Sequence, residues 1–247
     1  MWSVEVLALV VATFLLGGLV KGVLGFGLPV VALALLAATL GLKQAIALFI
    51  VPALITNLWQ GAVGGSFLAI LRRIWSLLLL GIIFTWAGVG ILAAADQKLA
   101  SGLLGVLLFL YGVHGLTSPQ ISPPGEREAW LTPLVGALSG AAFGLTGTMM
   151  VPGVIYLQSL GFDRNTLVQS LGITFVALTL ALGVSLSMHN LLPSELSLLS
   201  VLAFLPAALG MFVGQRIRHR VSEEMFRKLF FWALPVAGLY MIVRAFV

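Results

Sequence analysis

The chain contains no cysteine, and it carries few charges for its length of 247 residues. Without cysteine it can form no disulfide, no thiolate metal site and no thiol nucleophile. Charged residues make up 9% of the sequence, whereas about a quarter is usual for soluble domains. This shortage excludes an ordinary soluble fold, because a water-facing surface on a chain of this size needs more charge.

Apolar residues are correspondingly frequent in the sequence. They account for 60% of the sequence, and several uninterrupted runs could cross roughly 30 Å of hydrocarbon as helices. The sequence lacks the alternation of apolar and polar residues that a membrane β-barrel requires. The predicted fold class is therefore all-α, a polytopic membrane protein.

Ten apolar segments form the predicted helices. They lie at about 3–20, 24–40, 44–64, 74–95, 98–116, 131–145, 147–160, 164–188, 194–214 and 225–245. Residues 1–20 lack a basic start and a small-residue cleavage site, so we expect a retained first helix rather than a signal peptide. Residues 117–130, TSPQISPPGEREAW, gather proline, serine and three charges. They predict a cytoplasmic linker between a first membrane repeat at 1–116 and a second at 131–247.

The two predicted repeats open on similar glycine patterns. The first half has glycines at Gly18, Gly22, Gly25, Gly27 and Gly41. The second half has them at Gly136, Gly140, Gly144, Gly147 and Gly161, which lie 118 to 120 residues later. Helices of similar length follow in each half, which indicates an internal duplication.

Basic residues predict the orientation of the repeats, because they gather in cytoplasmic loops. The loops at 65–73 and 215–228 are basic and are placed inside, whereas the loop at 189–195 has no Lys or Arg and is placed outside. The basic residues then predicted inside are Arg72, Arg73, Arg127, Arg164, Arg216, Arg218, Arg220, Arg227 and Lys228. Those predicted outside are Lys43, Lys98 and Arg244, with Lys21 unassigned. Corresponding loops then face opposite sides, which is typical of an inverted repeat, and both termini lie outside.

This topology predicts how each half begins. Residues 131–160 must start and finish on the cytoplasmic side, but two full crossings need about 40 residues. We therefore expect a hairpin that turns within residues 144–147, and an equivalent turn within residues 22–27. Each half would open with a glycine-tipped broken or re-entrant hairpin followed by three transmembrane helices, and the first hairpin could be re-entrant or fully spanning.

The hairpin tips are the first candidates for a substrate site. A half-helix that begins at such a turn presents unpaired N–H groups and a positive dipole, which suit an anion. The candidate residues there are Gly25, Phe26, Gly27, Gly144, Thr146, Gly147 and Thr148. Close helix packing is the alternative role for the glycines.

Polar residues in the following helices extend this candidate site. The residues are Asn57, Trp59 and Gln60 in the first half and Gln169 and Ser170 in the second. Amide and hydroxyl donors orient an oxyanion without placing a net charge in the membrane, although hydrogen bonds between helices would use the same groups. Lys21 is either a functional charge or a side chain that reaches to the membrane surface.

At these residues the chain resembles the TauE/SafE family of sulfite exporters. The resemblance is carried by KGVLGFGLPVVALALL in the first half, GALSGAAFGLTGTMMVP in the second and the VPALITNLWQ helix. The family pattern tends to run three glycines together, and this chain reads GFGLP and GLTGT instead. The resemblance implies a permease of the bacterial inner membrane that moves sulfite or an organosulfonate such as sulfoacetate outward, with possible coupling to protons.

The predicted function is therefore a secondary transporter that binds a small anion near mid-membrane between the two hairpin tips. The alternatives are an anion-selective channel, or a permease for a small carboxylate or another sulfur-containing solute. No enzyme is predicted, because the histidines lie in different elements and the spans hold no carboxylate pair. The expected partners are the small anion and the lipid bilayer, with no cofactor, metal or nucleic acid. The sequence does not specify the oligomeric state.

Overall fold

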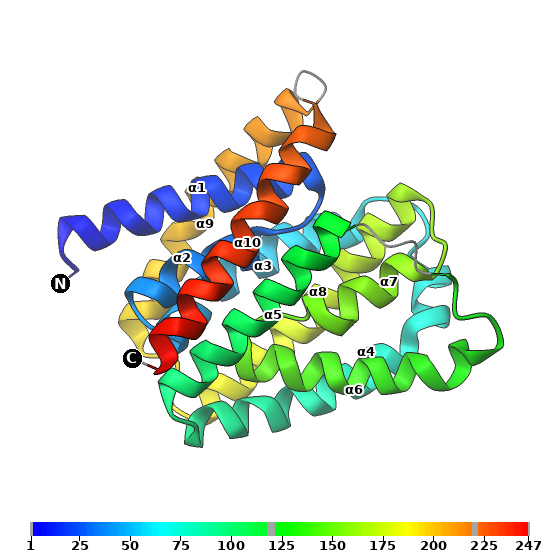
Figure 1. The fold of residues 1–247 in the computed structure, drawn as a ribbon, viewed down its shortest axis with the longest axis horizontal. Helices are drawn as coiled ribbons and strands as arrows, with labels where there is room; N and C mark the ends of the chain where they lie inside the picture. The colour runs from blue at the N-terminus through cyan, green and yellow to red at the C-terminus, as the bar shows by residue number, and fades with distance from the viewer. Residues whose placement is uncertain (1, 118–121, 219–221, 247) are drawn as a thin grey trace. The chain divides into compact units, whose positions relative to one another are not determined.

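The computed structural model describes residues 2–117, 122–218 and 222–246, and every regular element within them is helical (Figure 1). The helices are α1 (Val4–Leu24), α2 (Leu28–Thr39), α3 (Leu42–Ala62), α4 (Phe67–Ala94), α5 (Gln97–Thr117), α6 (Glu128–Thr146), α7 (Ile155–Ser159), α8 (Arg164–Met188), α9 (Ser194–Ile217) and α10 (Glu223–Phe246). A 3-10 turn, η1 (Gly125–Arg127), precedes α6, and a π-helical turn, η2 (Met150–Val154), precedes α7.

Eight of the helical segments in the described ranges are long and apolar enough to cross a membrane. They include α1, α3, α4, α5, α8, α9 and most of α10, together with α6 and the turn before it. Many of their apolar side chains are exposed on the protein surface, which suits contact with lipid rather than water. The prediction of a multi-pass helical membrane protein is confirmed.

The first helix is longer than its predicted span of 3–20. Ser3 caps its N-terminus, with the Ser3 hydroxyl accepting the Val6 N–H at 3.4 Å, and the helix continues through Gly22 to Leu24. The chain leaves the helix only at Gly25, where φ is 86°. The glycines before that point remain helical because they pack against another helix, so the turn comes later than residue 22.

The segment predicted as a loop at 65–73 is helical from Phe67 onwards. Ile70 is buried there while Arg72 and Arg73 are exposed, so the segment packs along one apolar edge. The backbone departs from helical geometry at Ile74, with φ −109° and ψ 15°, where the sequence predicts the span to begin. The prediction of a loop is wrong, but the predicted start of the span coincides with a kink.

The other basic and linker segments are also partly helical. Glu128 from the predicted linker lies in α6, and Arg227 and Lys228 lie in α10. Residues 118–121 of the linker and Arg220 lie outside the described residues.

The chain divides into two compact units that interleave along the sequence. Unit 1 consists of Met1–Ala53, Gln97–Thr117 and Leu192–Val247. Unit 2 consists of Leu54–Asp96 and Ser118–Leu191. In unit 1, α1 packs on α9 and α5 packs on α10, whereas in unit 2 α4 packs on α6 and α8 (Figure 1). Each unit thus combines segments from both sides of the linker.

Glycines let the helix backbones approach closely within each unit. In unit 1, a Cβ on Gly18 would lie 2.1 Å from the Ala207 carbonyl oxygen. In unit 2, a Cβ on Gly140 would lie 2.2 Å from the Gly81 oxygen, and one on Gly144 would lie 2.1 Å from the Thr85 oxygen. No side chain fits at these positions, as is common where small residues form membrane helix interfaces. The structure therefore gives Gly144 a packing contact with α4.

Candidate functional site

The chain of unit 1 breaks between α1 and α2 at Gly25-Phe26-Gly27. The Gly25 N–H donates to the Lys21 carbonyl at 2.8 Å, and both glycines are left-handed, with φ of 86° and 108°. A Cβ on Gly27 would lie 2.9 Å from Val20 Cγ1. Glycine is required at position 27 both by the backbone conformation and by the lack of space.

Aromatic contacts hold this turn in unit 1. The Phe26 ring lies edge-on to Tyr111 of α5 and to Phe230 of α10, with centroid distances of 6.5 and 6.1 Å. Phe230 in turn contacts Phe231 in the same manner at 5.3 Å. Such edge-to-face contacts are favourable in addition to the area that they bury. Phe26 therefore anchors the turn to α5 and α10.

Lys21 lies in the last turn of α1, one helical turn before Gly25. Lys21 is only 3% exposed, so the structure does not support the alternative in which its side chain reaches to the membrane surface. A positive charge near a helix C-terminus is favoured by the helix dipole. Unit 1 therefore has a buried basic residue close to its glycine turn.

Unit 2 has a corresponding break after α6. The Gly147 N–H donates to the Phe143 carbonyl at 2.8 Å, and Gly147 is left-handed with φ 77°. The Thr146 hydroxyl donates to the Ala142 carbonyl at 2.7 Å and accepts the Thr148 N–H at 3.4 Å. The Thr146 hydroxyl thus holds the turn itself.

Thr148 retains a donor at this turn. Its hydroxyl accepts the Met150 N–H at 3.4 Å, and the side chain is buried. Within the described ranges the hydroxyl hydrogen has no protein acceptor, so it remains available for a bound molecule.

The segment after this turn is not the continuous helix predicted at 147–160. It consists of η2 and the five-residue α7, and Val151 is extended with φ −118° and ψ 124°. Pro152 explains the break, because proline lacks an N–H and disfavours helical geometry in the residue before it. The donors at this turn are therefore individual hydroxyl and amide groups rather than the end of a long helix.

A buried hydroxyl lies against the same broken segment. A Cβ on Gly153 would lie 2.8 Å from Ser139 Oγ of α6. Within the described residues this oxygen has no hydrogen-bond partner, which is unusual for a buried polar group. Ser139 could not be singled out from the sequence, because a lone serine in a membrane helix is ordinary.

The two predicted glutamines join α3 to α8. The Gln60 amide donates to the Val168 carbonyl at 2.7 Å, and the Gln169 amide donates to the Gly61 carbonyl at 3.0 Å. The Gln169 oxygen accepts the Ser66 N–H, also at 3.0 Å. These contacts are the interhelical hydrogen bonds that the sequence left open as the alternative role.

The remaining predicted site residues differ in burial. Asn57 is buried, and Ser170 is buried with its hydroxyl donating to the Leu167 carbonyl at 2.8 Å. Trp59 is 64% exposed, so it points away from the interior that holds its neighbours. The predicted residues of unit 1 are thus Lys21, Gly25, Phe26 and Gly27, and the others belong to unit 2.

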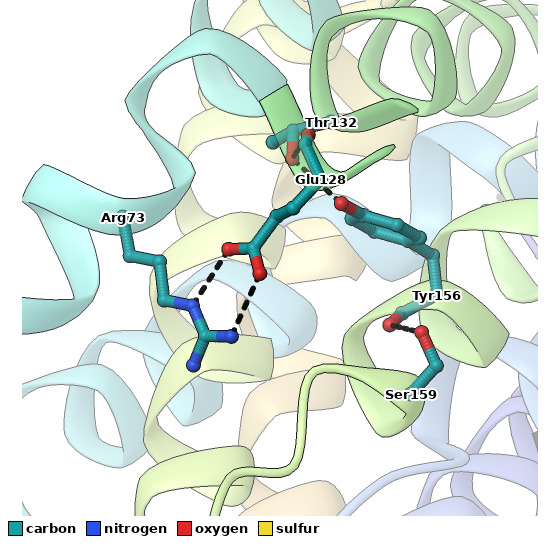
Figure 2. Close-up of polar contacts among 5 residues, drawn as sticks. All are labelled: Arg73, Glu128, Thr132, Tyr156 and Ser159. Atoms are coloured by element: carbon teal, nitrogen blue, oxygen red, sulfur yellow. Dashed lines mark hydrogen bonds and ion pairs between the residues drawn. The ribbon is translucent and has the colours of Figure 1, made fainter. Parts of the chain in front are cut away.

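A charged cluster that the sequence did not predict lies in unit 2 (Figure 2). The Arg73 guanidinium binds the Glu128 carboxylate through two contacts, Nε to Oε1 at 2.7 Å and Nη2 to Oε2 at 2.9 Å. The guanidinium also lies over the Phe162 ring, 4.8 Å from its centroid. A guanidinium and a carboxylate joined by two parallel hydrogen bonds are held in a defined relative orientation as well as at a defined distance. The ion pair therefore joins the start of α6 to α4.

Hydroxyl groups extend this cluster to α7. Thr132 Oγ1 lies 2.6 Å from the Tyr156 hydroxyl and donates to the Glu128 carbonyl at 2.6 Å (Figure 2). The Ser159 hydroxyl donates to the Tyr156 carbonyl at 2.7 Å. The cluster thereby fixes both arms of the broken segment, α6 and α7. The opposite charges of Arg73 and Glu128, in two segments predicted as cytoplasmic, were the only sequence signal for it.

Within the described ranges, no three His, Cys, Asp or Glu side chains lie together as a metal site would require. The observed elements define a class: a multi-pass helical membrane protein whose helices break at left-handed glycines. Its family follows from comparison with known proteins. The chain belongs to the sulfite exporter TauE/SafE family, whose model matches residues 9–241. This confirms the resemblance seen in the sequence. No curated protein and no solved structure gives a match.

Proposed function

We propose that the protein is a secondary transporter that exports a small oxyanion, either sulfite or an organosulfonate such as sulfoacetate. The family match over residues 9–241 supports the transporter class and the sulfur oxyanion. The observation that carries the proposal is that α1 and α6 end alike, at the left-handed residues Gly25 and Gly147. Two broken helices of this kind are typical of transporters built from repeats.

The proposal includes an inverted repeat of residues 1–116 and 131–247 joined by a cytoplasmic linker. Gly147 follows Gly25 by 122 residues, and the start of α8 at Arg164 follows the start of α3 at Leu42 by the same 122. These two offsets are close to the 118 to 120 that the glycine spacing suggests. The distribution of basic residues supports opposite orientations of the repeats, with both termini outside the bacterial inner membrane.

The proposed anion contacts lie at the glycine turn of each unit. In unit 1, the first amides of the 12-residue α2 and the buried Lys21 favour a negative charge. In unit 2, the Thr148 hydroxyl and the amides of the turn are the donors. Gln60 and Gln169 already bind backbone carbonyls, so we assign them the support of the site rather than contact with the anion.

Flux measurements on purified protein in liposomes test the proposed function. The panel contains sulfite, sulfate, sulfoacetate and small carboxylates, each with and without a pH gradient. We expect saturable flux of sulfite or sulfoacetate and exchange of labelled for unlabelled substrate. Flux that neither saturates nor exchanges would instead identify a channel, and preference for carboxylates would contradict the proposed substrate class.

A matched pair of glycine variants tests the site. Gly147 and Gly65 are both left-handed, with φ of 77° and 79°, and a Cβ on Gly65 would meet no atom within 4 Å. Gly147→Ala and Gly65→Ala therefore impose similar backbone strain in unit 2. We expect Gly147→Ala to reduce transport at least tenfold while Gly65→Ala leaves it nearly unchanged. Equal effects of the two variants would show that strain alone is responsible.

A further inference from the structure

A pocket of about 330 Å³ lies in unit 1, where α2 and α10 end and α5 begins. Its polar lining comes from three helices: Thr39 of α2, Gln97, Lys98 and Ser101 of α5, and Tyr240 and Arg244 of α10. The remaining lining residues are Ala37, Ala38, Leu40, Gly41, Met241 and Ala245. The volume falls within the range of small-molecule sites.

The described lining of this pocket carries two cations and no carboxylate. The Arg244 guanidinium donates to the Ala38 carbonyl near the end of α2, which fixes its position at the pocket. This bond uses one of the five guanidinium N–H groups, so donors remain for a planar or tetrahedral oxyanion. The Gln97 side-chain amide lies against Gly41, where a Cβ would overlap it. Asp96 precedes Gln97 but does not line the pocket.

Exposed apolar side chains extend from the pocket along α10. Val236 and Val243 are exposed, and they lie four residues before and three residues after Tyr240, which lines the pocket. These spacings place the three side chains on one face of α10. The end of a spanning helix is where it reaches the membrane surface, and tyrosine is enriched at that level. The pocket thus combines two basic side chains with an apolar face of α10 that continues toward the bilayer interior.

We infer that this pocket binds the phosphate headgroup of an anionic phospholipid, with an acyl chain lying on the exposed face of α10 formed by Val236, Tyr240 and Val243. Arg244 binds the phosphate oxygens through its fork of donors, and Lys98 adds a second positive charge. Free inorganic phosphate shares the charge, but it cannot use this apolar face. This inference concerns lipid recognition and stands apart from the transport of the proposed substrate.

Lipid binding to the purified full-length protein in detergent tests the inference. Short-chain phosphatidylglycerol is compared with phosphatidylcholine of the same chains and with inorganic phosphate, by native mass spectrometry and by thermal shift. We expect phosphatidylglycerol to bind at least tenfold more tightly than phosphatidylcholine, and inorganic phosphate at equal concentration to leave it bound. Displacement by inorganic phosphate would identify a free-anion site instead.

Variants locate the bound lipid. Each basic group near a headgroup contributes roughly fivefold in affinity, so Arg244→Gln combined with Lys98→Gln should weaken phosphatidylglycerol binding by about 25-fold. Arg227→Gln, near the other end of α10, is the matched control and should have little effect. Ser101→Phe fills the pocket while keeping the bond from Arg244 to Ala38, so it separates loss of the site from loss of the fold. Unchanged phosphatidylglycerol binding in Ser101→Phe would overturn the inference.

Discussion

The side-chain amide of Gln169 in α8 donates a hydrogen bond to the backbone carbonyl of Gly61 in α3, with 3.0 Å between Nε2 and O. The same side chain accepts the Ser66 N–H through its oxygen. A Cβ on Gly64, the left-handed residue between these two contacts, would lie 2.6 Å from that oxygen. The amide therefore holds the chain segment between α3 and α4 against α8.

Gln169→Leu tests this structural role. We expect it to lower the free energy of unfolding by about 1–3 kcal/mol, because the buried Gly61 carbonyl and the part-buried Ser66 N–H lose their partner. Denaturant unfolding of the purified protein measures the effect, with Gln158→Leu at an exposed position as the control. Unchanged stability together with a tenfold loss of substrate affinity would show that Gln169 contacts the anion instead.

The ion pair between Arg73 and Glu128 should contribute more than an ordinary surface pair. Its side chains are 38% and 27% exposed, and its two contacts fix the geometry. A double-mutant cycle with Arg73→Gln and Glu128→Gln should give a coupling energy of about 1 kcal/mol. The pair between Lys228 and Glu224, with side chains 64% and 69% exposed, should give no more than about 0.5 kcal/mol. A coupling at Arg73 no larger than this control would contradict the prediction.

Neutralising Lys21 distinguishes two ways of holding the anion. If backbone amides and hydroxyls at the turns supply most of the attraction, Lys21→Gln should weaken substrate affinity less than tenfold, and that is the expected result. A buried ionic partner left alone costs about 3–5 kcal/mol, so a direct counter-charge would produce a loss beyond a hundredfold. Substrate titration of the wild type, Lys21→Gln and Asn57→Ala measures the affinity of each protein for the anion. A loss beyond a hundredfold at Lys21 with none at Asn57 would refute the expected account.

Asp163 makes the stability of α8 depend on pH. Hydrogen bonds from the Thr166 hydroxyl, and then from the Thr166 and Asn165 N–H groups, hold the pKa of this carboxyl below its ordinary value of 3.8. A lowered pKa in the folded state stabilises the fold above the ordinary value, and the contribution is lost as the pH falls through the lowered one. Asp163→Asn keeps a capping side chain but removes the charge.

We therefore expect the wild type to unfold at a higher temperature than Asp163→Asn near neutral pH, with the difference shrinking below a pH of about 4. Thermal scans of both proteins across this range measure it. A difference that stays constant at all pH values would mean that the carboxylate charge is irrelevant to the cap.

Hydropathy and glycine spacing were enough to predict the helical class, the order of the segments and the approximate position of both breaks. Long apolar runs have one stable form in a bilayer, since helices satisfy their own backbone hydrogen bonds. The first turn lies at residues 25–27, within the predicted range 22–27, whereas Gly22 at the start of that range is helical and packs against α9. Whether a glycine serves packing or a turn depends on the neighbouring helix, which the local sequence does not reveal.

The charged cluster and the glutamine contacts could not be predicted for a related reason. Arg73 and Glu128 are 55 positions apart, and Gln60 and Val168 are 108 apart. Periodicity identifies which face of a helix is apolar, but not which distant helix it meets. Pro152 could have predicted the broken segment after Gly147, because a proline acts locally and disfavours helical geometry in the residue before it.

The interleaving of the two units also determines the order in which the protein can be completed during synthesis. All segments of unit 2 have been made once Leu191 has emerged from the ribosome, whereas unit 1 still lacks Leu192–Val247. Until then α1 has no α9 to cover Gly18 and Gly22, and α5 has no α10. The first helices to enter the membrane are thus among the last to gain their partners, and they must persist in lipid with their glycine faces open while the rest of the chain is inserted.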